Sequence, residues 1–145
     1  MSNKIIDGKL ISSEIREKVK KFGDQLKSKT GKVPGLAVVL VGENPASRVY
    51  VKNKIEKTIE VGFNSIEHKL SEKVSESELI DLVDKLNNDE NVQGILVQLP
   101  LPEHVNSDKI LDRIKPEKDV DGFHANNVCL LYTSPSHETD RHRVC

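Results

Sequence analysis

The sequence lacks the features that would direct a protein to a membrane, to export or to nucleic acid. Its 145 residues carry a formal net charge of −1, so no basic excess is available for nucleic acid or anionic lipid. No apolar run reaches the length of a membrane span, and the N-terminal stretch MSNKIIDGKL lacks the apolar segment of a signal peptide. We therefore expect one compact cytoplasmic domain with no nucleic-acid or membrane partner.

Cysteine is scarce, and both copies, Cys129 and Cys145, lie at the C-terminal end. The segment CLLYTSPSHETDRHRVC, residues 129–145, also contains histidines, but its spacing matches no zinc module. Its first part instead resembles the translation of a transposon-based sequencing adapter. We therefore expect the authentic protein sequence to end near Val128 and residues 129–145 to be a non-native read-through tail. No metal site is expected.

Glycine is absent after Gly122, and the stretch VGEN contains only Gly42. A dinucleotide-binding domain needs a glycine-rich turn between a strand and a helix to receive the pyrophosphate. This chain is therefore not expected to bind such a cofactor by itself.

Three stretches predict strands. The run LAVVLV, residues 36–41, is entirely apolar, and the run VQGILVQLP, residues 92–100, contains the apolar stretch ILV before Gln98 interrupts it. Uninterrupted branched apolar runs are typical of strands covered on both faces, as in a parallel sheet. The stretch FNSIEHKL, residues 63–70, alternates in part and predicts a further strand.

Two helices are predicted in the first half of the chain. Apolar residues recur at helical spacing over residues 10–28, and Gly31 provides a stop. Asn44 and Pro45 supply an N-cap and a first-turn proline for a helix that we expect to extend to about Gly62.

Two further helices are predicted downstream. Ser75 and Glu78 can form a capping box for a helix whose apolar stripe consists of Leu79, Leu82, Val83 and Leu86. A short helix is expected over residues 107–114, before the loop KPEKDVDGFH. Together with the strands, these helices predict an α/β domain with a mainly parallel sheet flanked by helices in three layers.

Polar residues follow two of the predicted strands. Parallel strands joined by right-handed crossovers end at one edge of the sheet, where open α/β sheets bind ligands. Tyr50 and Lys54, one helical turn apart, can therefore converge with Gln98 on one cleft. On spacing alone such a pair is more often a packed ring beside a solvated lysine. At this edge, however, partial desolvation disfavours the ammonium form, and the lysine can act as a general base.

Gln98 and Asp121 each allow two interpretations. An amide within an apolar run is most often satisfied by backbone groups, but it can also hydrogen-bond a lysine without adding charge. Asp121 can stabilise a turn before Gly122, or as a buried carboxylate it can accept paired N–H groups from an aminopyrimidine-like ring. His124 has no recognisable partner and is assigned no role.

Residues 3–128 resemble the N-terminal part of the bifunctional methylenetetrahydrofolate dehydrogenase/cyclohydrolase family. Three stretches match family signatures in the right order and spacing: PGLAVVLVGENPASRVYVKNK, GILVQLPLP and KPEKDVDGFH. The resemblance implies that residues 1–128 are the folate-binding catalytic domain of a two-domain enzyme of one-carbon metabolism and purine biosynthesis. The family's Rossmann domain, which follows this region, is missing from the chain. The family's C-terminal helices pack back onto the N-terminal domain, so the piece is expected to be only marginally stable.

The resemblance also implies roles for single residues. Lys54 would be the catalytic lysine, oriented and tuned by Gln98. Tyr50 would help to position the pteridine ring, which Asp121 would anchor. The same substrate site would include Ser47, Leu99 and Pro100.

The implied chemistry has two steps. 5,10-Methylenetetrahydrofolate is oxidised with NADP, which the missing domain would bind, and water then opens the methenyl ring to give 10-formyltetrahydrofolate. A neutral Lys54 would take a proton from the water, because an ammonium would repel the cationic intermediate. The full-length parent is expected to be a homodimer.

Alternatives to this interpretation stay open. The parent can retain only the dehydrogenase or only the cyclohydrolase step, or the chain can be a non-catalytic module that binds a folate or another small ligand. The joint presence of Tyr50, Lys54, Gln98 and Asp121 weighs against such a module. The choice between NAD and NADP stays open, because the residues that read the ribose phosphate would lie in the missing domain.

Overall fold

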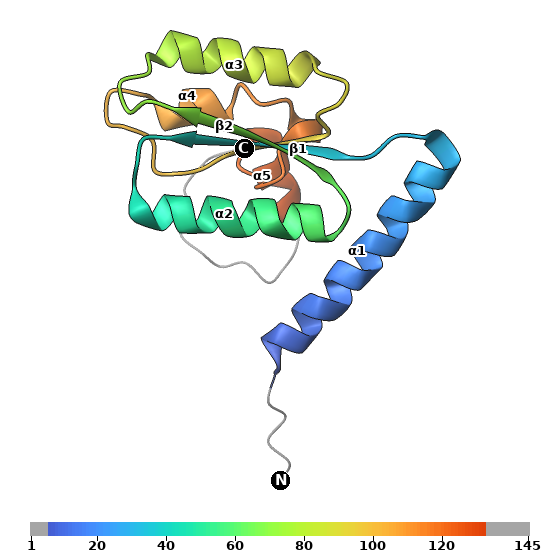
Figure 1. Cartoon of the computed structure of the whole chain (residues 1–145). Helices are drawn as coiled ribbons and strands as arrows, with labels where there is room; N and C mark the ends of the chain where they lie inside the picture. Colours follow the sequence, from blue (N-terminus) through green and yellow to red (C-terminus); the bar gives the residue numbers. More distant parts are fainter. Residues whose placement is uncertain (1–5, 133–145) are drawn as a thin grey trace.

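A three-stranded parallel sheet forms the centre of the protein (Figure 1). The computed structural model describes residues 6–132. β1 (Gly35–Val41) lies between β2 (Asn64–Leu70) and β3 (Gly94–Val97) and pairs with both in parallel. The predicted strands and their parallel arrangement are therefore confirmed, although β3 takes up only the middle of its apolar run.

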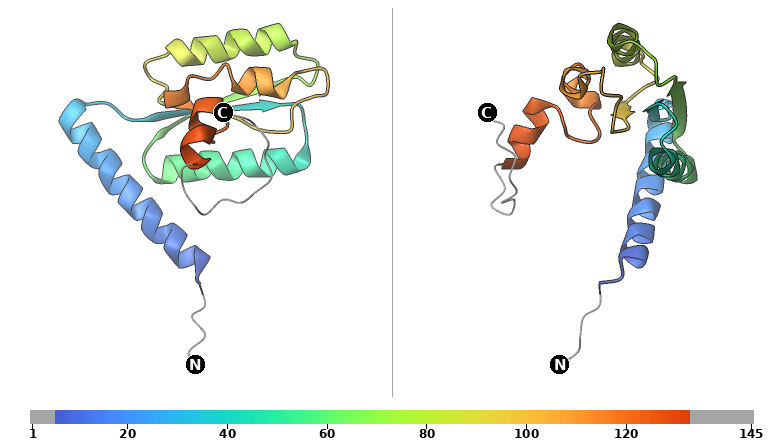
Figure 2. Two further views of the ribbon diagram at one scale, coloured as in Figure 1. Left: turned by 180° about the vertical axis from the view of Figure 1, so that it is seen from behind. Right: turned by 90° about the vertical axis from the view of Figure 1, so that its left-hand side faces the viewer.

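Helices cover both faces of this sheet (Figures 1 and 2). α2 (Pro45–Glu60) lies on one face, whereas α3 (Glu76–Asn88) and α4 (Ser107–Leu111) lie on the other. The predicted three-layer α/β architecture is confirmed.

The central strand β1 contributes to the core on both faces because its successive side chains point in opposite directions. Val38 packs with Val51 of α2, whereas Val39 belongs to the cluster formed with Leu79 and Val83 of α3. All of these side chains are almost completely buried. Each contributes about 1.5–3 kcal/mol relative to an exposed position, which makes the sheet and its two helical layers the stable part of the chain.

The helix ends follow the predicted local chemistry. The Asn44 Oδ1 atom accepts hydrogen bonds from the backbone N–H groups of Ala46 and Ser47 at 3.0 and 3.1 Å, and Pro45 opens α2. The reciprocal capping box of Ser75 and Glu78 is present at the start of α3. These caps satisfy backbone donors that a helix leaves without an internal partner.

The structure differs from the predictions after α3. α4 ends at Leu111 rather than Ile114, and the following loop contains a short 3₁₀ helix, η1 (Pro116–Lys118). The sequence patterns did not predict α5 (Ala125–Tyr132), whose second half consists of the first residues of the proposed tail. The rest of that tail, residues 133–145, lies outside the described residues.

α1 (Gly8–Thr30) is confirmed as a helix and ends at Gly31, which adopts the left-handed conformation with φ 70°. The helix projects away from the sheet (Figures 1 and 2) and contains no buried residue. An ion pair of 3.0 Å joins Arg16 to Glu60 of α2, and Gly23 passes close to Phe63. The apolar residues along α1 remain 43–69 % exposed; they are Leu10, Ile11, Ile15, Phe22 and Leu26.

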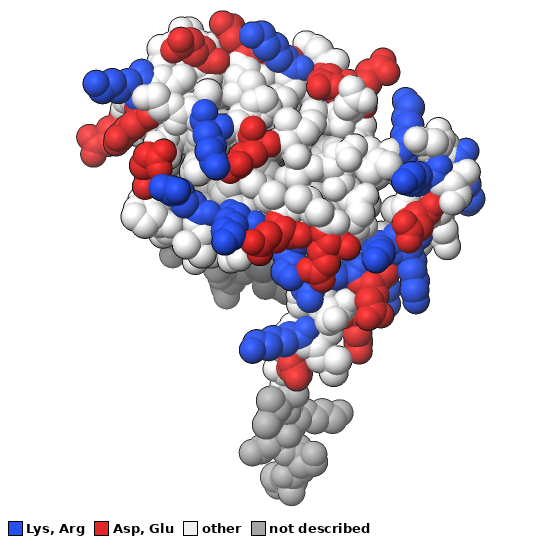
Figure 3. Space-filling model, viewed as in Figure 1, with Lys and Arg blue, Asp and Glu red and all other residues white. Residues whose placement is uncertain are grey.

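The visible surface intermixes charges of both signs. Figure 3 shows basic and acidic side chains side by side over α1 and α2, without a broad patch of one sign on this face. Within residues 6–132, no helix is both long and apolar enough to cross a membrane.

Candidate functional site at the carboxyl edge of the sheet

The carboxyl ends of β1 and β3 bring together two segments that are far apart in the sequence. β1 leads through the turn at Gly42 into α2, which carries Lys54, while β3 leads directly into Gln98. The Gln98 N–H donates to the carbonyl of Val39 at 2.9 Å and so extends the β1–β3 pairing by one residue. This backbone bond fixes where the Gln98 side chain begins.

The side chains of Lys54 and Gln98 meet, as the sequence predicted. The Lys54 Nζ atom donates to the Gln98 Oε1 atom at 3.3 Å, and both residues are partly buried. The other end of the amide is also held, because Nε2 donates to the Leu99 carbonyl at 2.8 Å. A carbonyl can only accept, so the amide nitrogen must face Leu99 and the amide oxygen must face the lysine.

Asp121 lies close enough to Lys54 to interact with it electrostatically. Desolvation raises the pKa of the Asp121 carboxyl above its ordinary value; the Lys54 ammonium opposes this rise and the Asp119 carboxylate adds to it. The residue as a whole is exposed and its carboxyl is only partly desolvated, so of the two interpretations of Asp121 the structure does not contain the fully buried carboxylate. Lys54 and Gln98 therefore form the centre of a cluster, and Asp121 lies within electrostatic range of Lys54 on its exposed side.

Tyr50 shares the helix face of Lys54 but remains outside this cluster. Its side chain is 61 % exposed, and within residues 6–132 no hydrogen bond joins it to the other three residues. Ser47, on the same face of α2, is only 4 % exposed. Leu99 is partly buried and Pro100 is exposed, and the peptide bond between them is cis.

A second carboxylate, that of Asp119, was not singled out from the sequence. Its Oδ1 atom accepts from the Gly122 N–H at 3.1 Å, and its Oδ2 atom accepts from the His124 N–H at 2.8 Å. The turn before Gly122 is therefore stabilised by Asp119, and the role that we considered for Asp121 belongs to its neighbour. The available signal was an aspartate three residues before a glycine, a spacing typical of side-chain-capped turns.

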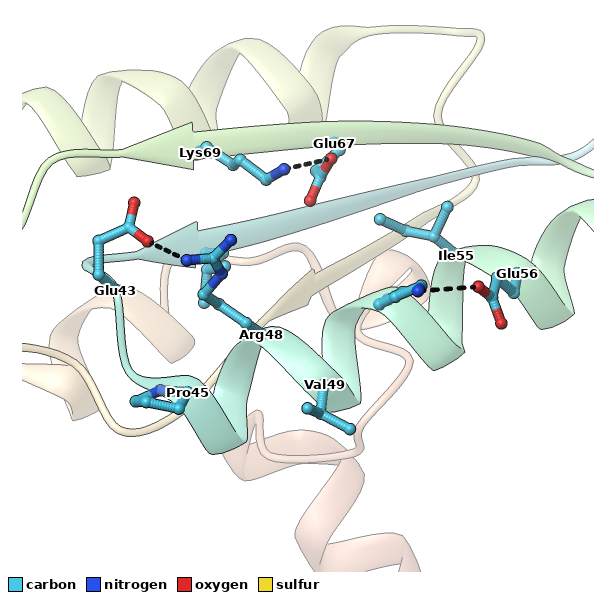
Figure 4. A pocket seen from close by; sticks show the side chains of 10 residues that line it. Glu43, Pro45, Arg48, Val49, Ile55, Glu56, Glu67 and Lys69 are labelled. Atoms are coloured by element: carbon cyan, nitrogen blue, oxygen red, sulfur yellow. Dashed lines mark hydrogen bonds and ion pairs between the residues drawn. The ribbon is translucent and has the colours of Figure 1, made fainter.

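The opposite flank of α2 contains a hollow that is separate from this cluster (Figure 4). Its apolar lining consists of Leu40, Pro45, Val49 and Ile55. Its charged residues pair with one another: Arg48 with Glu43 at 2.8 Å, Lys69 with Glu67 at 3.2 Å, and Lys52 with Glu56 at 3.9 Å. A hollow whose charges already neutralise one another offers a ligand few unsatisfied groups, so the surroundings of Lys54 are the better candidate for a functional site.

The described residues do not fit a dinucleotide cofactor. At the start of α2, the side chain of Asn44 already occupies the first free N–H groups, and the Glu43 carboxylate lies next to them in the chain. At the start of α3, the Ser75–Glu78 box and Glu76 place carboxylates where a pyrophosphate would lie. Over residues 6–132 there is also no cluster of three His, Cys, Asp or Glu side chains suited to a metal ion.

A lysine, an amide and a carboxylate at the carboxyl edge of a parallel sheet are typical of α/β domains that bind small ligands or catalyse reactions on them. More specifically, the chain belongs to the tetrahydrofolate dehydrogenase/cyclohydrolase family, whose catalytic-domain model matches residues 6–121. The resemblance found in the sequence is thereby confirmed.

Individual relatives support this assignment. The bifunctional protein FolD 2 of Roseobacter denitrificans is 55% identical over 133 residues, which are 92% of this chain and 44% of that protein. The FolD protein of Desulfatibacillum aliphaticivorans is 56% identical over 131 residues, or 90% and 43% of the two chains. The chain therefore spans less than half the length of these curated relatives.

Solved structures show the same fold. The FolD methylenetetrahydrofolate dehydrogenase/cyclohydrolase of Campylobacter jejuni superposes with a TM-score of 0.85 at 49% identity, over 88% of this chain and 45% of that one. The Trypanosoma brucei enzyme, solved with NADP and an inhibitor, gives 0.85 at 32% identity, over 88% and 43%. In both cases the similarity covers less than half of the solved chain.

Proposed function

We propose that this chain is the folate side of an enzyme that oxidises 5,10-methylenetetrahydrofolate to the methenyl form and hydrolyses that product to 10-formyltetrahydrofolate. The observation that carries this proposal is the contact of 3.3 Å between Lys54 Nζ and Gln98 Oε1 at the carboxyl edge of the sheet, beside Asp121. Family membership and the names of the relatives supply the substrate class.

Lys54 is the proposed base for ring opening. When water attacks the methenyl carbon, a proton must leave the water oxygen, and a neutral amine within hydrogen-bonding distance can accept it. The Gln98 amide suits this task because it holds the amine in place without a negative charge that would favour the ammonium.

Asp121 is the proposed anchor of the pteridine ring. The aminopyrimidine part of a pterin offers adjacent N–H donors, and a carboxylate can accept two of them in parallel. The exposed ring of Tyr50 would pack against the bound pteridine, which would remove both from water. Ser47, Leu99 and Pro100 are proposed to line the same pocket.

The oxidation step requires residues that this chain does not supply. NADP would accept the hydride, as the Trypanosoma brucei relative solved with that cofactor indicates. The described residues do not fit a dinucleotide, so we propose that the parent binds it through a separate domain. The contribution of this chain to that step is to hold the folate in place.

We propose that the apolar stripe of α1 is covered by the remainder of the parent protein. The chain spans 44% of its first relative, and Leu10, Ile15 and Phe22 are more than half exposed here. Contiguous apolar surface of this kind is typical of an interface.

We further propose that residues 1–128 are the folate-binding domain and residues 129–145 a non-native tail. The parent would be a cytoplasmic homodimer of one-carbon metabolism and purine biosynthesis.

A pair of calorimetric titrations of the 145-residue chain tests this function. Tetrahydrofolate is expected to bind, whereas NADP is expected to give no measurable heat, because the helix N-termini are capped and acidic. Binding of NADP in the micromolar range, or failure of tetrahydrofolate to bind at millimolar concentration, would contradict the proposal. Assays of both activities in the completed parent then distinguish a bifunctional from a monofunctional enzyme.

A further inference from the structure

The Asp119 carboxylate is the centre of the loop that carries Asp121. It accepts three hydrogen bonds: from the N–H groups of Gly122 and His124, and from the Asn127 Nδ2 atom at 2.9 Å. The two backbone donors lie on the far side of Asp121 in the chain. Asn127 also donates to the carbonyl of Pro116 at 2.9 Å, so the same network reaches back to the 3₁₀ helix η1 before the loop.

The same loop is attached to the sheet on its near side. Asp119 forms an isolated parallel bridge with Ile95 of β3, which adds a short extension next to the strand that ends at Gln98. Val120 packs so closely over Gly94 that a Cβ atom at position 94 would lie 2.6 Å from its Cγ1 atom. The backbone on both sides of Asp121 is therefore held, on one side by β3 and on the other by the Asp119 carboxylate.

We propose that Asp119 is a positioning residue for folate binding: its carboxylate closes the turn over Val120–Gly122 and thereby holds Asp121 toward Lys54 and the bound pteridine. The proposal rests on the folate-anchoring role proposed for Asp121. Both Asp119 oxygens already accept hydrogen bonds from donors of its own loop, so the proposed role is indirect, through the backbone that carries Asp121.

The chemistry of this turn explains why a carboxylate stands at position 119. Hydrogen bonds to an ionised acceptor are stronger than neutral ones, and a carboxylate has enough lone pairs for three donors. An asparagine would keep one acceptor oxygen but would direct an NH₂ group at a donor. Two N–H groups facing each other in this way would open the turn and free the backbone of Asp121.

The test compares four variants of the full 145-residue chain with the unaltered protein. Asp119→Asn disrupts the network, and Asn127→Ala removes one of the three donors to Asp119 together with the bond to Pro116. Asp121→Asn removes the proposed anchor, and Asp81→Asn removes an equal charge from the exposed face of α3. Amide hydrogen exchange at Gly122, His124 and Leu96 reports on the turn and on β3, and calorimetry with tetrahydrofolate reports on binding.

Asp119→Asn is expected to accelerate exchange at Gly122 and His124 while Leu96 stays protected. It is also expected to weaken tetrahydrofolate binding by about 10-fold, the scale of one charge-assisted hydrogen bond. Asn127→Ala should change both readouts in the same direction but less, and Asp81→Asn should change neither. If Asp119→Asn unfolds the chain, the hydrogen exchange and the tetrahydrofolate affinity of Asn127→Ala decide the test.

Two results would overturn the proposal while leaving the proposed function of Asp121 in place. The first is unprotected Gly122 and His124 amides in the unaltered protein. The second is an unchanged tetrahydrofolate affinity in Asp119→Asn while Asp121→Asn weakens binding. If Asp119→Asn unfolds, an unchanged affinity in Asn127→Ala has the same meaning. If instead Asp121→Asn leaves the affinity unchanged, the proposed function of Asp121 fails and the positioning role for folate fails with it. The exchange data would then still show whether Asp119 closes the turn.

Discussion

The two flanks of α2 carry similar residues but differ in how their charges are satisfied. On the outer flank, toward β2, Arg48 lies beside Glu43 (Figure 4), and Lys52 pairs with Glu56. On the inner flank, toward β3, Lys54 contacts the neutral amide of Gln98 and, within residues 6–132, has no ion pair. The helix thus exposes a neutralised surface on one side and a cation without a directly bonded carboxylate on the other.

The difference indicates where binding energy is still available. Exposed ion pairs contribute roughly 0–1 kcal/mol and leave little for a ligand to gain. A lysine held by an amide keeps donors free, and the nearby Asp121 carboxylate has a raised pKa because it is partly desolvated. Unsatisfied and perturbed groups of this kind concentrate at functional sites.

The largest expected effect separates the two flanks directly. In the completed parent, Lys54→Met keeps the apolar stem but removes the amine, so cyclohydrolase turnover should fall by roughly 10²–10⁴-fold. The matched change on the outer flank, Lys52→Met, should leave turnover unchanged. Folate affinity should suffer much less than turnover in Lys54→Met, and the dehydrogenase step can survive in part. Near-normal cyclohydrolase turnover in Lys54→Met would remove the distinction between the flanks.

Asp121→Asn is expected to weaken tetrahydrofolate binding by roughly 10–100-fold, because a charged acceptor is replaced by a neutral one. Its effect on stability should have the opposite sign. The pKa of Asp121 is higher in the folded than in the unfolded protein. Ionisation of Asp121 therefore destabilises the folded state as the pH rises from the unfolded-state pKa through the folded-state pKa. The variant should therefore unfold at the same or a slightly higher temperature at neutral pH. This difference in stability should vanish at a pH below the unfolded-state pKa of Asp121, where the protonated aspartate is as neutral as the asparagine.

Thermal unfolding at two pH values, run beside the calorimetry, checks the second half of this prediction. A variant that loses both affinity and stability at neutral pH would show that Asp121 supports the fold rather than a ligand.

Gln98→Glu should make the inner flank resemble the outer one. A carboxylate at this position would favour the ammonium form of Lys54, so the pH–rate profile of ring opening should move to higher pH by about one unit. Glu56→Gln, which breaks a pair on the outer flank, is the control and should leave the profile in place. An unchanged profile in Gln98→Glu would mean that the contact between Lys54 and position 98 does not govern the base.

The smallest expected effect concerns the C-terminal tail. If residues 129–145 are non-native, their deletion should leave the unfolding midpoint unchanged in calorimetry. The chain would still bind tetrahydrofolate through the inner flank of α2. A domain of this size responds by several degrees to about 1 kcal/mol, so a lower midpoint would show that the tail packs on the protein.

Local sequence chemistry was sufficient for most of the framework. The N-cap at Asn44, the capping box at Ser75 and the stop at Gly31 each involve residues within one helical turn of one another. The apolar run of β1 reads as a buried strand because the two faces of a central strand both need apolar side chains. Predictions were less accurate where local signals are short, as at α4 and α5.

The sequence by itself also determined the family, because three separate motifs must match in order. It placed Tyr50 and Lys54 on one helix face, since helical periodicity is a local property. The sequence predicted that Tyr50, Lys54 and Gln98 converge. Only the tertiary structure decided that Tyr50 remains exposed while Lys54 and Gln98 meet, because this depends on how α2 packs against β3. The tertiary structure likewise decided that Asp119, not Asp121, closes the turn. The folded loop brings the backbone N–H groups of Gly122 and His124 to the oxygens of Asp119.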